Sequence, residues 1–195
     1  MSTELIEIAE LVTSWGAKGE QVEAVVTSDR ETEVRAYEGE IESLTVAESQ
    51  GIGVRVIKDG RQGFAYAGTL EEKELLEVLN EARDNASFAS PDEFSGLAEP
   101  DGVESVSLDV YSDGVNSLAT SKKIDYALEL EKLTLATDKR ISGIESSEYT
   151  DVVSESAIAT STGIRSSSKE SGCCLMVYAL AEEKGETQTG FGFSI

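Results

Sequence analysis

The central stretch of the chain, residues 33–68, alternates apolar and polar positions. Because successive side chains of a strand point to opposite faces of a sheet, this period of two predicts an antiparallel meander with one buried face. Three glycine-containing turns, Glu38-Gly39-Glu40, Gly51 and Asp59-Gly60, are expected to divide it. The apolar positions that define the alternation are Val34, Ala36, Ile41, Leu44, Val46, Ile52, Val54 and Val56.

Asp59-Gly60 is the strongest hairpin signal in the sequence. It separates the apolar runs 54–58 and 61–66 by two residues. A two-residue type I′ turn needs a positive φ at both central positions, and Asp-Gly adopts this conformation readily. The sequence therefore predicts that these two runs pair as antiparallel strands.

Three other stretches have apolar residues at helical spacing. The first predicted helix covers residues 3–15, where apolar residues recur every three or four positions. The second covers residues 69–87 and is expected to begin with the capping box Thr69-Leu70-Glu71-Glu72. The third covers residues 121–137, with Ser121 as its cap. The first two are predicted to have one apolar face, whereas the apolar stripe of the third is broad and predicts burial on more than one side.

A second series of strands is expected near the end of the chain. Alternating apolar residues predict strands over residues 152–160, 173–181 and 187–195. Ser161-Thr162-Gly163 and residues 182–185 are the expected turns between them.

The two halves of the sequence resemble each other. Gly51 corresponds to Gly172, and Gly63-Phe64-Ala65-Tyr66 corresponds to Gly190-Phe191-Gly192-Phe193. This repeat predicts an α+β fold built from duplicated modules, each a helix with an antiparallel meander and flanking helices. The two meanders are expected to join edge to edge or to pack face to face.

The predicted modules are separated by a segment of different composition. Residues 88–120 contain both prolines of the chain, Pro91 and Pro100, among Ser, Asp and Gly. We therefore predict a first α+β module over residues 1–87, a proline-containing connector over 88–120 and a second module over 121–195.

The charge of the chain narrows the classes of partner. It has 16 Lys and Arg against 38 Asp and Glu, a net charge of -22. Such a chain repels phosphate backbones and anionic lipid, so neither nucleic acid nor membrane is expected as a partner. The acidity has two interpretations, a well-solvated surface or an acidic surface that binds a basic partner.

The acidic N-terminus lacks the features of a secretory signal, and a cytoplasmic location is expected.

The absence of His removes several kinds of chemistry. The sequence contains no His, so Ser-His-Asp and Cys-His nucleophiles and His-ligated zinc are excluded for these residues. Cys173 and Cys174 are adjacent, which disfavours a mutual disulfide, and are expected to be reduced packing residues. Gly51-Ile52-Gly53 lacks the third glycine of a dinucleotide-binding loop and predicts close packing or a bulge.

Carboxylate pairs are the remaining candidates for acid–base chemistry. Glu38 with Glu40, and Glu182 with Glu183, flank turns where solvent reaches them, and pairs are common among so many acidic residues. Ser166-Ser167-Ser168 has no base beside it in the sequence. No catalytic, cofactor-binding or metal-binding residue is therefore assigned, and the residues alone favour a scaffold, a binding module or the non-catalytic part of something larger.

Several motifs resemble one known family. E-V-R-A-Y-E-G-E-I-E-S from residue 33, E-S-Q-G-I-G-V-R-V-I-K-D-G-R-Q-G-F-A from residue 48, A-T-S-T-G from residue 159 and G-E-T-Q from residue 185 carry the likeness. They resemble the N-terminal region of the TldD/PmbA proteins, once called modulators of DNA gyrase. The resemblance covers essentially the whole chain in order and is closer to the PmbA (TldE) branch.

The resemblance implies a function for the family rather than for single residues. Family members resemble subunits of a heterodimeric zinc metalloprotease that acts on flexible peptides. Their H-E-x-x-x-H metal motif lies in the C-terminal half of the TldD-type subunit, and PmbA-type subunits lack it. None of those positions exists in these residues, so no site residue is carried over and zinc is expected only in the partner or in a missing C-terminal half. A last strand that ends at residues 193–195 without a cap favours truncation.

Two functions therefore stand as hypotheses. The first is the N-terminal domain of a PmbA/TldE-like subunit, inactive alone, which binds a TldD-like partner or a second copy and holds a flexible peptide along a strand edge. The alternative is an acidic regulatory module for a basic partner such as DNA gyrase. A hydrolase that uses carboxylates alone is a third hypothesis.

Overall fold

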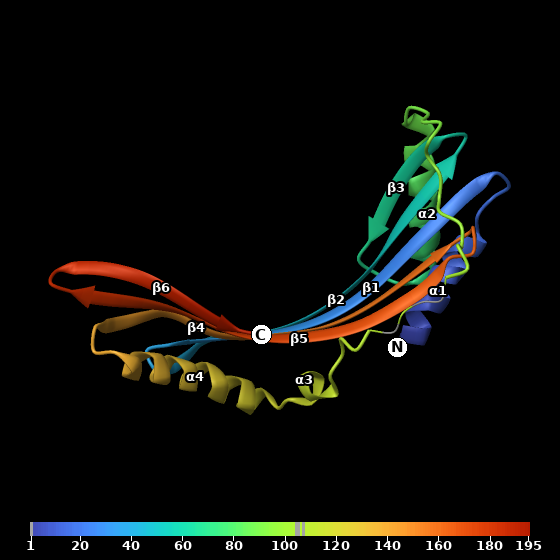
Figure 1. Ribbon diagram of the computed structural model, residues 1–195. Coiled ribbons are helices and arrows are strands. Elements are labelled where there is room, and N and C mark those ends of the chain that lie inside the picture. The colour runs from blue at the N-terminus through green and yellow to red at the C-terminus, as the bar shows by residue number, and fades with distance from the viewer. Residues whose placement is uncertain (1, 104–105, 107) are drawn as a thin grey trace. The chain divides into compact units, whose positions relative to one another are not determined.

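The computed structural model describes residues 2–103, 106 and 108–195, so three positions of the predicted connector lie outside the described residues. It contains four helices and six strands in the described part of the chain (Figure 1). In chain order the elements are α1 (Ser2–Ser14), β1 (Glu20–Tyr37), β2 (Glu40–Lys58), β3 (Arg61–Ala67), α2 (Glu72–Phe88), α3 (Asp113–Ser117), α4 (Thr120–Thr137), β4 (Ile141–Thr160), β5 (Arg165–Glu183) and β6 (Glu186–Ser194).

The strands form one antiparallel sheet with the order β3-β2-β1-β4-β5-β6. Each predicted meander is thus present, with its three strands in chain order, and the two meet edge to edge through β1 and β4. The predicted α+β class with duplicated meanders and flanking helices is confirmed.

Three tight hairpins connect strands of the sheet. Asp59 and Gly60 have φ values of 51° and 70°, and β2 and β3 pair from Lys58 opposite Arg61. The predicted type I′ turn is therefore confirmed. Glu38-Gly39 and Lys184-Gly185 adopt the same pair of positive φ angles at the other two hairpins.

Several details of the strand prediction are wrong. β4 and β5 begin at Ile141 and Arg165, well before the expected residues 152 and 173. Gly51 does not divide the meander, because β2 runs unbroken from Glu40 to Lys58. Residues 42–48 of β2 are exposed on both faces, including Leu44 and Val46, although alternation predicted one buried face. The reason is tertiary, because no described helix side chain packs onto this part of β2 in the buried clusters of the structure.

Both predicted helix caps are also wrong. The N-cap of α2 is Glu71 and makes no side-chain capping bond; the Thr69 hydroxyl instead accepts a hydrogen bond from the Glu71 amide at 3.3 Å. The N-cap of α4 is Ala119, ahead of the expected Ser121, and it too makes no side-chain capping bond. Packing of the apolar faces, rather than capping, therefore fixes where these helices begin.

The described residues divide into two compact units that interleave along the chain. Unit 1 comprises residues 1–29, 49–109 and 154–169, and unit 2 comprises residues 30–48, 110–153 and 170–195. Each of the long strands β1, β2, β4 and β5 contributes to both. The modules predicted over residues 1–87 and 121–195, with a connector over 88–120, were inferred from a repeat in the sequence. The two compact units do not test that repeat.

The core of unit 1 lies between its strands and the helices α1 and α2. Figure 1 shows α2 lying along β3, and the two elements pack closely. The buried cluster contains Leu5, Ile6, Ala9, Val12, Val22, Ala24, Val26, Ile52, Val54, Val56, Ala65, Leu75, Val78, Leu79, Ala82, Ala157 and Ala159, with Trp15 packed against it.

The core of unit 2 is smaller and lies under α4. The expected burial of this helix on more than one side is wrong, because its buried residues, Lys123, Ala127 and Glu131, form a single face. Val34 and Ala36 of β1 and Tyr149 of β4 pack against Ala127, with Ile124, Leu128 and Leu175 at the margin. Among the described residues, no helix has both the length and the apolar character needed to cross a membrane.

Candidate functional site

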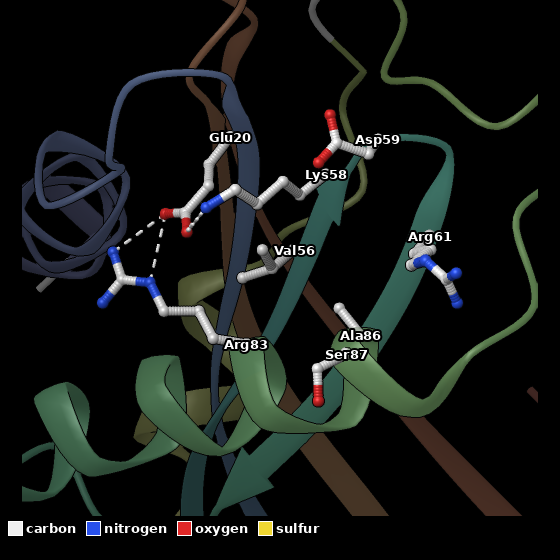
Figure 2. Close-up of a pocket in the computed structure, with 8 residues that line it drawn as sticks. All are labelled: Glu20, Val56, Lys58, Asp59, Arg61, Arg83, Ala86 and Ser87. Carbon is white, nitrogen blue, oxygen red and sulfur yellow. Dashed lines mark hydrogen bonds and ion pairs between the residues drawn. The ribbon is translucent and has the colours of Figure 1, made fainter.

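A hollow in unit 1 gathers several charged side chains. Its volume is about 380 Å³ and it is lined by Glu20, Val56, Lys58, Asp59, Arg61, Arg83, Ala86 and Ser87 (Figure 2). The residues come from the start of β1, the β2–β3 hairpin and the last turns of α2.

Glu20 is the centre of this cluster. Its carboxylate Oε2 accepts hydrogen bonds from Arg83 Nε at 3.1 Å and Nη2 at 3.0 Å, and from the Ala17 amide at 2.9 Å. Lys58 Nζ lies 3.6 Å from its Oε1. Burial alone would raise the pKa of Glu20, but these bonds and charges outweigh it and hold the pKa below its ordinary value.

The two Arg side chains of the hollow are also engaged with the protein itself. Arg83 also donates to the Trp15 carbonyl at 2.7 Å and to Asn80 Oδ1 at 2.9 Å, and Arg61 donates to the Ala89 carbonyl. These bonds link α1, β1, β2 and α2. The geometry therefore supports a structural brace rather than a ligand site.

The ion pairs of Glu20 should make the stability of the protein depend on pH. A carboxyl whose pKa is lowered by folding contributes stability above its unfolded pKa, ordinarily about 4.5, and that contribution is lost as the pH falls through the lower folded value. Glu20→Gln should therefore lower the free energy of unfolding by about 1–3 kcal/mol at pH 7 and have a smaller effect at about pH 3. Urea unfolding at both pH values, followed by Trp15 fluorescence, measures this; an equal loss at both would contradict it.

A second polar cluster is buried in unit 2. Lys123 of α4 and Asp151 of β4 form an ion pair with Nζ and Oδ2 2.5 Å apart, and both side chains are 5% exposed. Lys123 Nζ also donates to Thr32 Oγ1 at 3.1 Å and lies 5.9 Å from the centre of the Tyr149 ring. Burial and the neighbouring Asp151 carboxylate raise the pKa of Tyr149 well above its ordinary value. The cluster holds α4 against the strands.

The face of the sheet opposite α4 carries exposed aromatic rings in unit 2. Phe191 pairs with Tyr178 and Phe193 pairs with Met176, so these side chains share one face. The neighbours Leu175 and Val177 point the other way, where Leu175 packs on the α4 cluster. We call Tyr178, Phe191 and Phe193 the ring ladder.

The two edge strands of the sheet differ in how they are covered. β3 packs against α2, and its Phe64 carbonyl accepts a hydrogen bond from Asn85 Nδ2 at 2.9 Å. β6 pairs with β5 on one side and has no strand on the other among the described residues, and all of its described positions are exposed. β6 is thus the more accessible edge for another strand.

The structure places the sequence candidates apart from one another. Glu38 and Glu40 lie at the β1–β2 turn, and Glu182 and Glu183 at the end of β5, all exposed. Ser166-Ser167-Ser168 is exposed on β5. Neither carboxylate pair is brought to a hollow with a nucleophile, so no acid–base site is built from them.

The cysteine and glycine candidates lie within strands. Cys173 and Cys174 are free thiols at successive positions of β5, the first exposed and the second half-buried. Gly51 and Gly53 lie inside β2, where a Cβ at Gly53 would meet the Phe64 ring at 3.1 Å. The expected close packing is therefore confirmed at Gly53.

The residues present do not fit a zinc site of the kind the resemblance implies. The chain has no His, and within the described residues no three His, Cys, Asp or Glu side chains converge as metal ligands. No step of the function is therefore derived through a metal held by these residues.

Sequence reasoning missed both buried charge clusters. Lys123 and Asp151 are 28 positions apart by their residue numbers and come from a helix and a strand, and Glu20 and Arg83 are farther apart still. No local signal pointed to Asp151, because it lies just before the predicted strand 152–160.

Two family models match the chain. The PmbA/TldA metallopeptidase domain 1 matches residues 22–86, and the PmbA/TldA metallopeptidase central domain matches residues 113–195. Metalloprotease PmbA of Escherichia coli O157:H7 is 22% identical over 180 residues, which cover 91% of this chain and 40% of the relative. A PmbA homolog of Haemophilus influenzae is 28% identical over 134 residues, 68% of this chain and 29% of that protein.

Solved structures share the fold. A putative modulator of DNA gyrase from Thermotoga maritima superposes with a TM-score of 0.82 at 22% identity, covering 96% of this chain and 42% of that one. TldE from Thermococcus kodakarensis gives a TM-score of 0.80 at 19% identity, with coverages of 99% and 42%. The chain thus spans about two fifths of the length of these structures and of the Escherichia coli relative.

Proposed function

Because the chain belongs to the PmbA/TldD metallopeptidase family, we propose that it is the N-terminal portion of a PmbA-type subunit that holds flexible peptides while proteolysis occurs elsewhere in the assembly. Relatives and structures named PmbA and TldE support the choice of branch. In this proposal the zinc is supplied by a TldD-like partner or by residues outside this chain, and a second copy is the alternative partner.

The observation that carries the proposal is the edge strand β6. An extended peptide can add to a free strand edge through main-chain hydrogen bonds, which do not depend on its sequence. This suits a protease that acts on unfolded segments, because such segments have unpaired amides and carbonyls to offer. β6 offers nine residues in register with β5 and a free second edge within the described part.

Proline substitutions in β6 test strand addition. Along a strand, successive residues direct their N–H and C=O groups to opposite sides, so one of Gln188 and Thr189 faces β5 and the other faces outward. Slow hydrogen exchange in the unaltered protein identifies the residue bonded to β5. A proline at the outward-facing residue removes the main-chain N–H that would bond to an added peptide. The sheet tolerates it there, because that N–H makes no bond to β5.

We expect the outward-facing variant among Gln188→Pro and Thr189→Pro to keep its circular dichroism spectrum and to bind a labelled unfolded peptide at least fivefold more weakly, as measured by fluorescence anisotropy. The inward-facing variant is the control for loss of β6 itself. Unchanged binding by a folded outward-facing variant would overturn strand addition at this edge.

A second candidate function rests on the net charge of -22. An acidic regulator would bind a basic protein, and the Thermotoga maritima protein is named a putative modulator of a DNA gyrase. Ionic strength separates the two functions, because a charge-driven complex is lost between about 0.05 and 0.3 M salt. Main-chain pairing with a neutral peptide should survive that change.

A further inference from the structure

We propose that the ring ladder beside the β6 edge selects basic residues at alternate positions of the bound peptide. This inference rests on the strand addition proposed above and names the class of peptide that the same site favours. Arg and Lys side chains of the added strand would lie over or beside the rings, on the face of the sheet opposite α4.

The first support is the geometry of the rings. The ring centroids of Tyr178 and Phe191 are 5.5 Å apart, and those of Phe191 and Phe193 are 6.3 Å apart with their planes within 8°. Phe191 and Phe193 are 62% and 63% exposed. An ordered row of open aromatic rings is costly to leave in water and is typical of an interaction surface.

The second support is the match between the ladder and a peptide strand. Side chains two residues apart in a strand lie on one face, about 6.6 Å apart. The Phe191–Phe193 spacing of 6.3 Å has nearly this value. A strand added beyond β6 would place alternate side chains directly beside Phe191 and Phe193, at the distance of ordinary cross-strand neighbours, about 5 Å.

The third support is charge. The faces of aromatic rings attract cations, most strongly the guanidinium group of Arg. In the β5–β6 hairpin, Glu182 lies on the face of the ladder, because it is four residues beyond Tyr178 on β5. Glu183 and Glu186 are paired with each other and point to the opposite face. On the same sheet face, the Arg35 guanidinium is already held by Glu42 at 2.6 Å and by Glu148 at 3.9 Å.

The surface is therefore aromatic and acidic, and its complement is an extended segment rich in Arg or Lys. Beside the ladder, β6 offers a peptide side-chain contacts on one face only. Gly190 and Gly192 occupy the intervening positions and have no side chains to contact a ligand. Selectivity would thus come from every second residue of the peptide.

The test uses three labelled peptides of about ten residues, long enough to span β6. The first alternates Thr with Arg. The second replaces each Arg by citrulline, which is neutral and nearly the same shape. The third is the Arg peptide with every amide N-methylated, so that the amides facing β6 are blocked whichever way the peptide runs. Binding to the protein that contains this chain is measured by anisotropy at about 0.15 M salt.

We expect the Arg peptide to bind at least tenfold more tightly than the citrulline peptide, and N-methylation to abolish binding. The double variant F191L/F193L should lose about two- to fivefold of the Arg preference for each ring removed while binding the citrulline peptide as before. The matched control F88L/F94L, at two rings that are each 89% exposed and outside the ladder, should keep the full preference.

The outcomes separate the two proposals. Equal binding of Arg and citrulline peptides, both abolished by N-methylation, would overturn the ring-ladder selection and leave strand addition standing. An Arg preference that F191L/F193L and F88L/F94L retain equally would assign it to the general charge of the protein and also overturn the selection. Arg-dependent binding that resists N-methylation would overturn strand addition, and no binding of any peptide would overturn both.

Discussion

Lys123→Met is expected to lower the free energy of unfolding by about 3–5 kcal/mol, because it leaves the Asp151 carboxylate buried without a counter-charge. Both side chains of the pair are 5% exposed. The Thr32 hydroxyl would lose its donor as well. Since small and medium-sized proteins are stable by only about 5–15 kcal/mol, this single change removes a large part of the total.

The double variant K123M/D151L separates loss of the charge pair from loss of packing. Removing both partners leaves no buried charge, so most of the lost stability should return. Urea unfolding followed by near-ultraviolet circular dichroism measures it, because Tyr126 and Tyr149 stack beside the pair with centroids 6.2 Å apart. A double variant as unstable as K123M would show that the ion pair is not what Lys123 contributes.

Gly63→Ala should cost about 3 kcal/mol, the upper end of the range for overpacking. A Cβ at Gly63 would fall against the carbonyl of Ala82 and the backbone of Ala86, so β3 approaches the main chain of α2 with no room for a methyl group. Backbone atoms in a packed helix cannot move aside as a flexible side chain can. The expected result is a large fall in the urea midpoint reported by Trp15, which packs on the same core.

Two other glycines are matched controls for this prediction. Gly68 follows β3, and no atom lies within 4 Å of the position that an alanine methyl group would take there. Gly190 is the repeat counterpart of Gly63 and has the same open surroundings as Gly68. Gly68→Ala and Gly190→Ala should change stability by less than about 1 kcal/mol in either direction. Equal losses at Gly63 and Gly190 would show that flexibility, rather than the contact with α2, explains the effect.

The parts of the fold that the sequence predicted are those specified by near neighbours. The Asp59-Gly60 turn is specified by two adjacent residues. The sequence repeat that contains Phe64 and Phe191 located the last strand of each meander, β3 and β6. The strand order of each meander followed from its short turns.

The start of β4 shows why the rest was not predictable. The sequence predicted a strand from residue 152, whereas β4 begins at Ile141. Ser147, Asp151 and Glu155 face inward along it, so its buried positions are polar. Their partners, the Ala127 carbonyl, Lys123 and Lys169, come from other segments, and no local pattern reveals them.

The candidate site was predictable only in part. The motif Gly190-Phe191-Gly192-Phe193 was visible in the sequence as a repeat. That its strand is an accessible edge depends on the order of all six strands, and that the rings stack depends on Tyr178 of β5. Both are long-range facts of the fold.

Hydrogen–deuterium exchange with and without an excess of unfolded peptide tests the central claim most directly. If the peptide adds as a strand, amides of β6, residues 186–194, should exchange more slowly in its presence, while those of β3, residues 61–67, should not change. Peptide binding that protects β3 or the helices and leaves β6 exchange unchanged would contradict the proposed role of this edge.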